Sequence, residues 1–198
     1  MTETPWWHPT RHADRRPLLL ARNRIQRAIR DWLEVEGFTE VDPAALAVSP
    51  GNEAHLHAFA TASTDDGGRS VTRYLHTSPE FAMKKLLAAG ETRIAAFAHV
   101  WRNREGGPRH AAEFTMLEWY RAGQDYTVLM EDTAQMLRLA AGQAGAALLH
   151  HAGAACDPFL PYDRLSVAEA FGRFADIDLL ATIRADGRTD RDALAARM

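Results

Sequence analysis

The sequence predicts an α+β fold in which an antiparallel sheet is flanked by helices. Two apolar runs of strand length, 94–101 and 114–120, enclose a polar stretch with glycine and proline, which is typical of a long-looped antiparallel hairpin. Antiparallel strands flanked by helices favour an α+β domain over a doubly wound parallel one. The 198 residues, 46% hydrophobic and 25% charged, suit one globular domain, or one domain and part of another.

The first predicted helix begins at Pro17. Its apolar residues recur every three or four positions with arginines between them, and Gly37 is expected to end it. A short strand at 38–41 should follow, because apolar and polar residues alternate there until Asp42 and Pro43 end the pattern. The chain therefore opens with a helix, a tight glycine turn and a short strand.

Residues 44–70 carry weak periodicity and several turn-forming residues, so we expect loops around a weak strand near 55–61. A clearer strand is predicted at 71–76. Ser78 and Pro79 then provide a helix start, since the hydroxyl can cap free amides and the proline ring lacks an N–H. That helix is expected to close near residue 90.

Two further helices are predicted after the hairpin. Asp125 should cap a helix whose apolar residues share one face, and Ser166 with Glu169 forms a capping box before a short helix through Phe174. Past Ile177 the sequence turns polar, and its last residues follow an open helical pattern.

Composition and targeting signals exclude several classes of function. The net charge of −3 is small, so the overall electrostatic field of the protein does not indicate a charged partner such as nucleic acid. Cys156 is the single cysteine, and the histidine pairs lack acidic or cysteine partners at ligand spacing, so we expect no disulfide and no metal site. Without a signal pattern or an apolar run of about 20 residues, we expect a cytoplasmic protein with no membrane segment.

The hairpin carries the densest polar chemistry of the chain. Alternate residues of a strand share one face, so Phe114, Glu118 and Tyr120 are expected on one surface with Arg102. The alternative is a solvated hairpin held by cross-strand ion pairs. No glycine-rich GxGxxG or GxxxxGK[ST] loop occurs, so a nucleotide would have to bind by another route.

Three segments resemble the class II aminoacyl-tRNA synthetases. VWRNREGGPRHAAEFTMLEWYRAG is similar to motif 2 in its lysyl-tRNA synthetase version, LHTSPEFAMKKLLAAG is similar to the amino-acid-binding strand and helix, and the first helix with GFTEV resembles motif 1. The resemblance covers most of residues 16–140. The WY ending of motif 2, and a motif 1 helix that begins too early to leave room for an anticodon-binding barrel, are most similar to the lysyl-tRNA synthetase paralogues that modify a lysine of elongation factor P.

This resemblance implies ATP-dependent activation of lysine or (R)-β-lysine as an acyl-adenylate, followed by transfer to a lysine of elongation factor P. It also implies a homodimer that uses ATP and Mg²⁺. Residues 1–15 would be an N-terminal extension, and 16–198 a partial catalytic domain with motifs 1 and 2 only. The metal-binding acids and motif 3 of the family are not found in the 198 residues, so we expect a C-terminally incomplete domain with low turnover or none and no metal ligands.

The resemblance also assigns roles to individual residues. Arg102 matches the catalytic arginine, whose planar guanidinium can bridge a carboxylate and a phosphate, and Phe114 matches the ring that stacks on adenine. The residues implied in ATP binding are Arg102, Asn103, Arg104, Glu105, His110 and Phe114. Those implied in binding the amino acid are Ser78, Pro79, Glu80, Glu118 and Tyr120.

The sequence departs from the family pattern at three places. Arg104 stands where an acid is common, so adenine recognition would come from Glu105 or from the backbone. Two alanines replace the usual Asn-Pro before the EFTMLEWY run, and Pro43 is displaced within motif 1. Two other hypotheses stay open: a lysyl-tRNA synthetase fragment that acylates tRNA, and a catalytically silent binding or dimerisation module. The preferred lysine isomer and the acceptor stay undecided.

Overall fold

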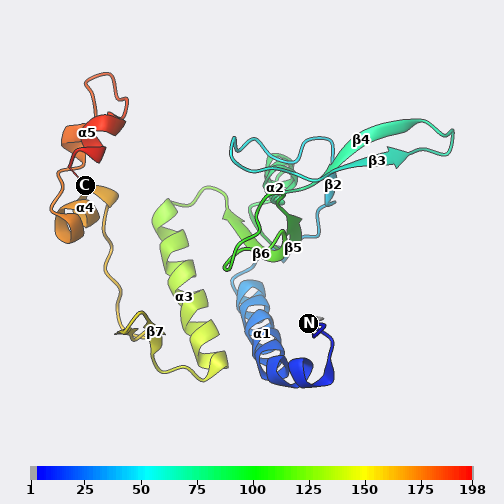
Figure 1. Cartoon of the computed structure of the whole chain (residues 1–198), viewed down its shortest axis with the longest axis horizontal. Helices are drawn as coiled ribbons and strands as arrows, with labels where there is room; N and C mark the ends of the chain where they lie inside the picture. Colours follow the sequence, from blue (N-terminus) through cyan, green and yellow to red (C-terminus); the bar gives the residue numbers. More distant parts are fainter. Residues whose placement is uncertain (1–3, 198) are drawn as a thin grey trace. The chain divides into compact units, whose positions relative to one another are not determined.

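The computed structural model describes residues 4–197. They form two compact units, one ending at Pro158 and the other beginning at Phe159 (Figure 1). Residues 1–3 of the predicted N-terminal extension lie outside the described residues. No described helix has the length and apolar character that would let it cross a membrane.

The first unit contains three helices and eight strands among its described residues. In chain order they are α1 (Pro9–Val35), β1 (Thr39–Glu40), β2 (Leu46–Ala47), β3 (Ala60–Thr64), β4 (Ser70–Leu75), α2 (Glu80–Ala88), β5 (Arg93–Trp101), β6 (Glu113–Arg121), α3 (Tyr126–Ala144), β7 (Leu149–His151) and β8 (Ala154–Cys156). The second unit contains α4 (Val167–Ala175), a 3₁₀ turn at Leu180–Thr182 and α5 (Arg191–Ala195). The open helical pattern predicted near the C-terminal end thus corresponds to α5.

The predicted long-looped hairpin is confirmed as β5 and β6, which pair antiparallel from Arg93 opposite Arg121 to Trp101 opposite Glu113. A second sheet has the order β2-β4-β3 and is also antiparallel, and β7 pairs with β8. One pairing departs from the predicted antiparallel arrangement, because β1 runs parallel to β5. Its direction follows from the intervening chain, which forms the second sheet and α2 before returning as β5.

The two faces of the β5–β6 hairpin are covered by different helices. On one face, Ala95 packs with Ile29 and Leu33 of α1 and Met136 of α3. On the other, Ile94 and Ala96 pack against Met83 of α2. Figure 1 shows α2 on one side of the hairpin and α1 with α3 on the other. Burial of both faces fixes which residues of each strand point toward α2.

The helix boundaries follow their capping chemistry, with one exception. Asp125 caps α3 by accepting from the Thr127 N–H, and the capping box of Ser166 and Glu169 opens α4, so both predicted starts are confirmed. The predicted start of the first helix at Pro17 is wrong, because α1 begins at Pro9. Pro9 suits the first turn, where no N–H is needed, and the polar turn that follows it has no apolar periodicity to reveal it.

The tight glycine turn after α1 forms as predicted, whereas the weak strand lies later in the chain than expected. Gly37 has φ +79°, the left-handed conformation that glycine adopts without strain, and it follows the end of α1 as predicted. The strand expected near 55–61 is β3, shifted to Ala60–Thr64. Within the loop before it, His57 makes a single bridge to Asn103.

A buried ion pair fastens the hairpin to α3. Arg121 at the end of β6 donates to both oxygens of Asp132, at 2.7 and 2.9 Å, and each side chain is only 5% exposed. Trp119 Nε1 donates to the same carboxylate at 3.1 Å, and Arg121 also donates to Glu36 and lies over the Phe38 ring. The hydrogen bond to Asp132 is the main cause that raises the pKa of Arg121. This network joins β6, α3 and the turn after α1.

We expect Asp132→Ala to destabilise the protein by roughly 3–5 kcal/mol, because it leaves the Arg121 guanidinium buried without its carboxylate. The free energy of unfolding from urea titration measures this. The matched control is Asp31→Ala, which removes an exposed aspartate of α1. The double variant Arg121→Met/Asp132→Leu should lose less than Asp132→Ala alone, and an Asp132→Ala variant as stable as Asp31→Ala would contradict this account.

Candidate active site

Arg102 and Phe114 lie together where the hairpin strands meet the connecting loop. The Arg102 N–H donates to the Ala112 carbonyl at 2.9 Å, and its Nε donates to the Thr77 carbonyl at 3.2 Å. Its guanidinium carbon stands 5.4 Å from the centre of the Phe114 ring. The two Nη groups have no hydrogen-bond or ion-pair partner within residues 4–197. The forked donors of Arg102 are therefore available to an anion.

The loop between β5 and β6 is folded onto itself. Asn103 donates its N–H to the His57 carbonyl at 2.6 Å, and its side-chain oxygen accepts from the Arg104 N–H at 2.8 Å. Arg104 has φ +65°, which is unusual for a residue other than glycine. His110 pairs with Gly107 through the backbone near the loop tip and is exposed, whereas Glu105 is half-buried. These four side chains therefore do not converge with Arg102 on one cavity.

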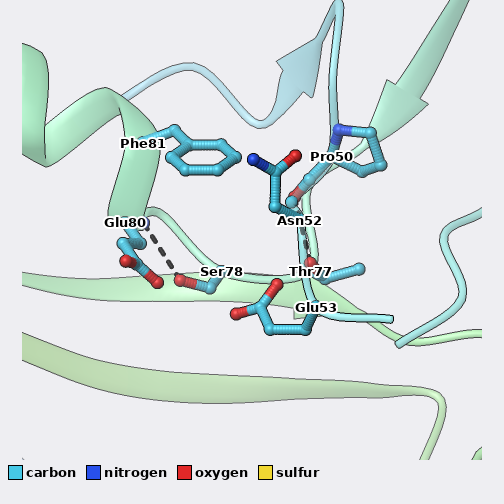
Figure 2. Close-up of a pocket in the computed structure, with 8 residues that line it drawn as sticks. Pro50, Asn52, Glu53, Thr77, Ser78, Glu80 and Phe81 are labelled. Carbon is cyan, nitrogen blue, oxygen red and sulfur yellow. Dashed lines mark hydrogen bonds between the residues drawn. The ribbon is translucent and has the colours of Figure 1, made fainter. Parts of the chain in front are cut away.

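A cavity of about 240 Å³ lies beside the start of α2. Two segments distant in sequence line it: the loop Pro50, Gly51, Asn52 and Glu53, and the turn Thr77, Ser78, Glu80 and Phe81. Figure 2 shows the carboxylates of Glu53 and Glu80 on the Ser78 side of this cavity, while the Asn52 amide points to the Phe81 ring. The predicted residues Ser78 and Glu80 are thus brought to one polar pocket.

Glu118 is held at this site by two hydroxyl groups. Ser78 Oγ donates to Glu118 Oε2 at 2.9 Å, and the Tyr120 hydroxyl donates to Glu118 Oε1. Ser78 Oγ also accepts from the Glu80 N–H at 3.0 Å, which confirms the predicted helix start. Burial raises the pKa of the Tyr120 phenol, and the hydrogen bond to Glu118 raises it further. The phenol therefore stays a donor to the carboxylate, whose position is fixed without a cation.

Lys84 forms an ion pair with one of these carboxylates. It stands one helical turn after Glu80 and donates to that carboxylate. The pKa of Lys84 is raised by this hydrogen bond and by the charge of Glu80, with smaller contributions from Glu118 and Glu53. Three carboxylates therefore act on one ammonium group, which itself is largely exposed.

Thr77 connects the cavity with Arg102. It is 2% exposed, and both its N–H and its hydroxyl donate to the Pro50 carbonyl, at 3.3 and 3.0 Å. Its own carbonyl accepts from Arg102 Nε. Pro79, fully buried, completes the turn. One buried residue thus ties the loop at Pro50 to the guanidinium of Arg102.

Sequence reasoning did not identify the cavity loop or the role of Thr77. The sequence contains one indication of this loop, the polar residues Asn52 and Glu53 directly after Pro50 and Gly51. The same pattern is typical of an ordinary turn, so it did not predict a cavity. Gly51 has a spatial reason, because a Cβ there would stand 2.8 Å from Glu53 Oε2 and 2.8 Å from Thr77 Oγ1. Only the tertiary fold brings this loop to Ser78.

The residues that the structure describes do not fit a Mg²⁺ site. Within residues 4–197 no group of three or more acidic, histidine or cysteine side chains is arranged to hold a metal ion. Near the cavity, Glu118 already accepts from two hydroxyls and Glu80 from Lys84, so Glu53 is the one of these three carboxylates without a protein partner in the described chain. No chemistry is assigned to a metal on these residues.

Comparison with known proteins places the chain in a family. The family described as tRNA synthetases class II (D, K and N) matches residues 5–193. The chain belongs to this class II tRNA synthetase family. The resemblance seen in the three sequence segments is therefore confirmed, and the antiparallel sheets and helices agree with a class II synthetase-like domain.

Several curated relatives similar to this chain are named elongation factor P (R)-β-lysine ligase. The relative from Actinobacillus succinogenes is 40% identical over 139 residues, which are 70% of this chain and 42% of the relative. Those from Yersinia enterocolitica and Enterobacter sp. are each 34% identical, over 95% and 98% of this chain and 52% and 59% of their own length. The chain spans about half the length of these curated relatives.

We expect Tyr120→Phe to make the free energy of unfolding less dependent on pH in alkaline solution. The folded-state pKa of this phenol is raised, so the folded protein keeps a proton that the unfolded chain loses above about pH 10. The resulting stabilisation is complete below that pH and declines as the pH rises further. Urea titrations between about pH 9 and about pH 11 would measure the difference.

The matched control for this experiment is Tyr126→Phe, which removes a phenol that is 69% exposed. If the free energy of unfolding of Tyr120→Phe falls with pH as steeply as that of the wild type in alkaline solution, the hydrogen bond to Glu118 does not hold the phenol proton as described.

Proposed function

We propose that this chain is the part of an ATP-dependent ligase that binds ATP and a lysine-type amino acid. In this proposal lysine or (R)-β-lysine is activated as an acyl-adenylate and then transferred to a lysine of elongation factor P. One observation carries it: the Arg102 and Phe114 pair lies on the same hairpin face as Glu118, and Thr77 links Arg102 to the polar cavity. The names of the curated relatives support the same acceptor.

The role proposed for each residue of the ATP site follows from the chemistry of its side chain. Arg102 would bind the α-phosphate and the substrate carboxylate through its two Nη groups, so that two anions are aligned in the geometry of the reaction. Phe114 would stack on adenine, since its ring is half-buried beside the guanidinium. Asn103, Arg104, Glu105 and His110, on the folded loop, would contribute to the ATP site by side chain or backbone.

The amino-acid side of the proposed site is the polar cavity. Glu80 and Glu118 would accept from the ammonium groups of the substrate, Ser78 and Tyr120 would hold Glu118, and Pro79 would shape the turn. Ionic hydrogen bonds in a partly buried pocket favour a diamino acid over an uncharged amino acid of the same length. A homodimer through α1 belongs to the proposal because α1, which resembles motif 1, leaves Leu18 72% exposed.

We expect Arg102→Ala to reduce pyrophosphate exchange into ATP by roughly 100-fold or more, because it removes the forked donors proposed to stabilise charge on the phosphate. Exchange is measured with lysine, with (R)-β-lysine and without amino acid, on the purified chain. The matched control is Arg69→Ala, an exposed arginine in the turn between β3 and β4, which should keep the wild-type rate.

Exchange that depends on a lysine-type substrate supports the proposal. Its absence with every substrate, in a chain shown to be both folded and complete, would contradict the enzymatic proposal and favour a silent binding module. Transfer of radiolabelled lysine to elongation factor P, compared with transfer to tRNA, then decides the acceptor. Preferential transfer to tRNA would overturn the assignment of elongation factor P and favour a lysyl-tRNA synthetase fragment.

A further inference from the structure

Glu53 lines the cavity as a second carboxylate beside Glu80, and it comes from a segment outside the motifs identified in the sequence. It stands on the loop after Pro50, and the cavity lies between this loop and the turn of Ser78 and Glu80. Figure 2 shows its side chain extended from the loop toward Ser78. The carboxylate therefore faces the side of the cavity on which the substrate ammonium groups are proposed to bind.

The three carboxylates differ in how the protein satisfies them. Glu118 accepts from Ser78 and Tyr120, and Glu80 accepts from Lys84. The Glu53 carboxylate has no hydrogen bond and no ion pair to any side chain within residues 4–197. Its charge still acts on Lys84, together with the charges of Glu80 and Glu118. Three carboxylates thus face a single resident ammonium, and Glu53 is the one left without a hydrogen-bond donor.

The backbone at Gly51 is suited to this placement of Glu53. A Cβ at residue 51 would stand 2.8 Å from Glu53 Oε2 and the same distance from Thr77 Oγ1, and real Cβ atoms do not approach so closely. Thr77 is buried and bonded to Pro50, so a side chain at residue 51 would displace the Glu53 carboxylate and shift the loop. Glycine at this position therefore permits the carboxylate to fold back over the loop and into the cavity.

We propose that Glu53 is a specificity-determining residue, whose carboxylate accepts a hydrogen bond from an ammonium group of a diamino acid bound between it, Ser78 and Glu80. This inference rests on the proposed function, because it concerns the same amino-acid pocket. The cavity determines the location, and an exposed carboxylate without a protein partner among the described residues determines the chemistry. A diamino acid brings two ammonium groups to these carboxylates, whereas an amino acid with a neutral side chain of equal length brings only one.

The test measures the affinity of the full chain for L-lysine and for L-norleucine, by ligand-observed NMR titration. Wild-type protein should prefer lysine, and Glu53→Gln should weaken lysine binding roughly tenfold, because one charge-assisted hydrogen bond is lost. ATP affinity should stay at the wild-type value. The matched control is Glu91→Gln, an exposed glutamate in the turn after α2, which should bind lysine as wild type does.

A second variant tests the placement of the carboxylate without removing it. Gly51→Ala should weaken lysine binding by a similar factor while Glu53 is still present, and its melting temperature shows whether the loop remains folded. If wild-type protein binds lysine and Glu53→Gln binds it equally well, this inference is overturned and the proposed function stands. If wild-type protein binds neither lysine nor ATP, the proposed function itself fails.

Discussion

The register of the β5–β6 hairpin is the constraint on which the rest of the structure depends. Because side chains alternate between the two faces of a strand, a slip of one residue would move Phe114, Glu118 and Tyr120 to the face covered by α1 and α3. In the observed register Glu118 stands opposite Ala96, whose small side chain leaves room beside it. Apolar burial against two sets of helices thus selects the polar face of the site.

Rigid and adaptable parts of the site are separated along the chain. Phe114, Glu118 and Tyr120 belong to a strand that Arg121 and Asp132 fasten to α3, and an ion pair of this kind is costly to break once it is buried. Glu53 and Arg104 stand on loops instead. Loops carried by a rigid scaffold commonly supply binding residues, and Glu53 lines the cavity beside the start of α2 from such a loop.

Thr77 is the physical link between the two halves of the site. Its backbone carbonyl orients Arg102, while its N–H and hydroxyl hold the loop at Pro50. A ligand that shifts either group must act on the same buried residue. Hydrogen bonds through Thr77 therefore connect the cavity loop to the guanidinium that follows β5.

Features that depend on interactions between neighbouring residues could be predicted from the sequence. The periodicity of the hairpin, the caps at Asp125 and Ser166, and the shared face of alternate strand residues all follow from neighbouring side chains, and the EFTMLEWY segment was enough to identify the family. The parallel pairing of β1 with β5, the helical start at Pro9 and the approach of Glu53 to the Ser78 turn were decided only by the tertiary structure. The strand pairing and the approach of Glu53 each bring together residues that are distant in sequence. The first turns of α1 have no apolar face that would predict a helix. Local patterns of side chains therefore could not predict these three features.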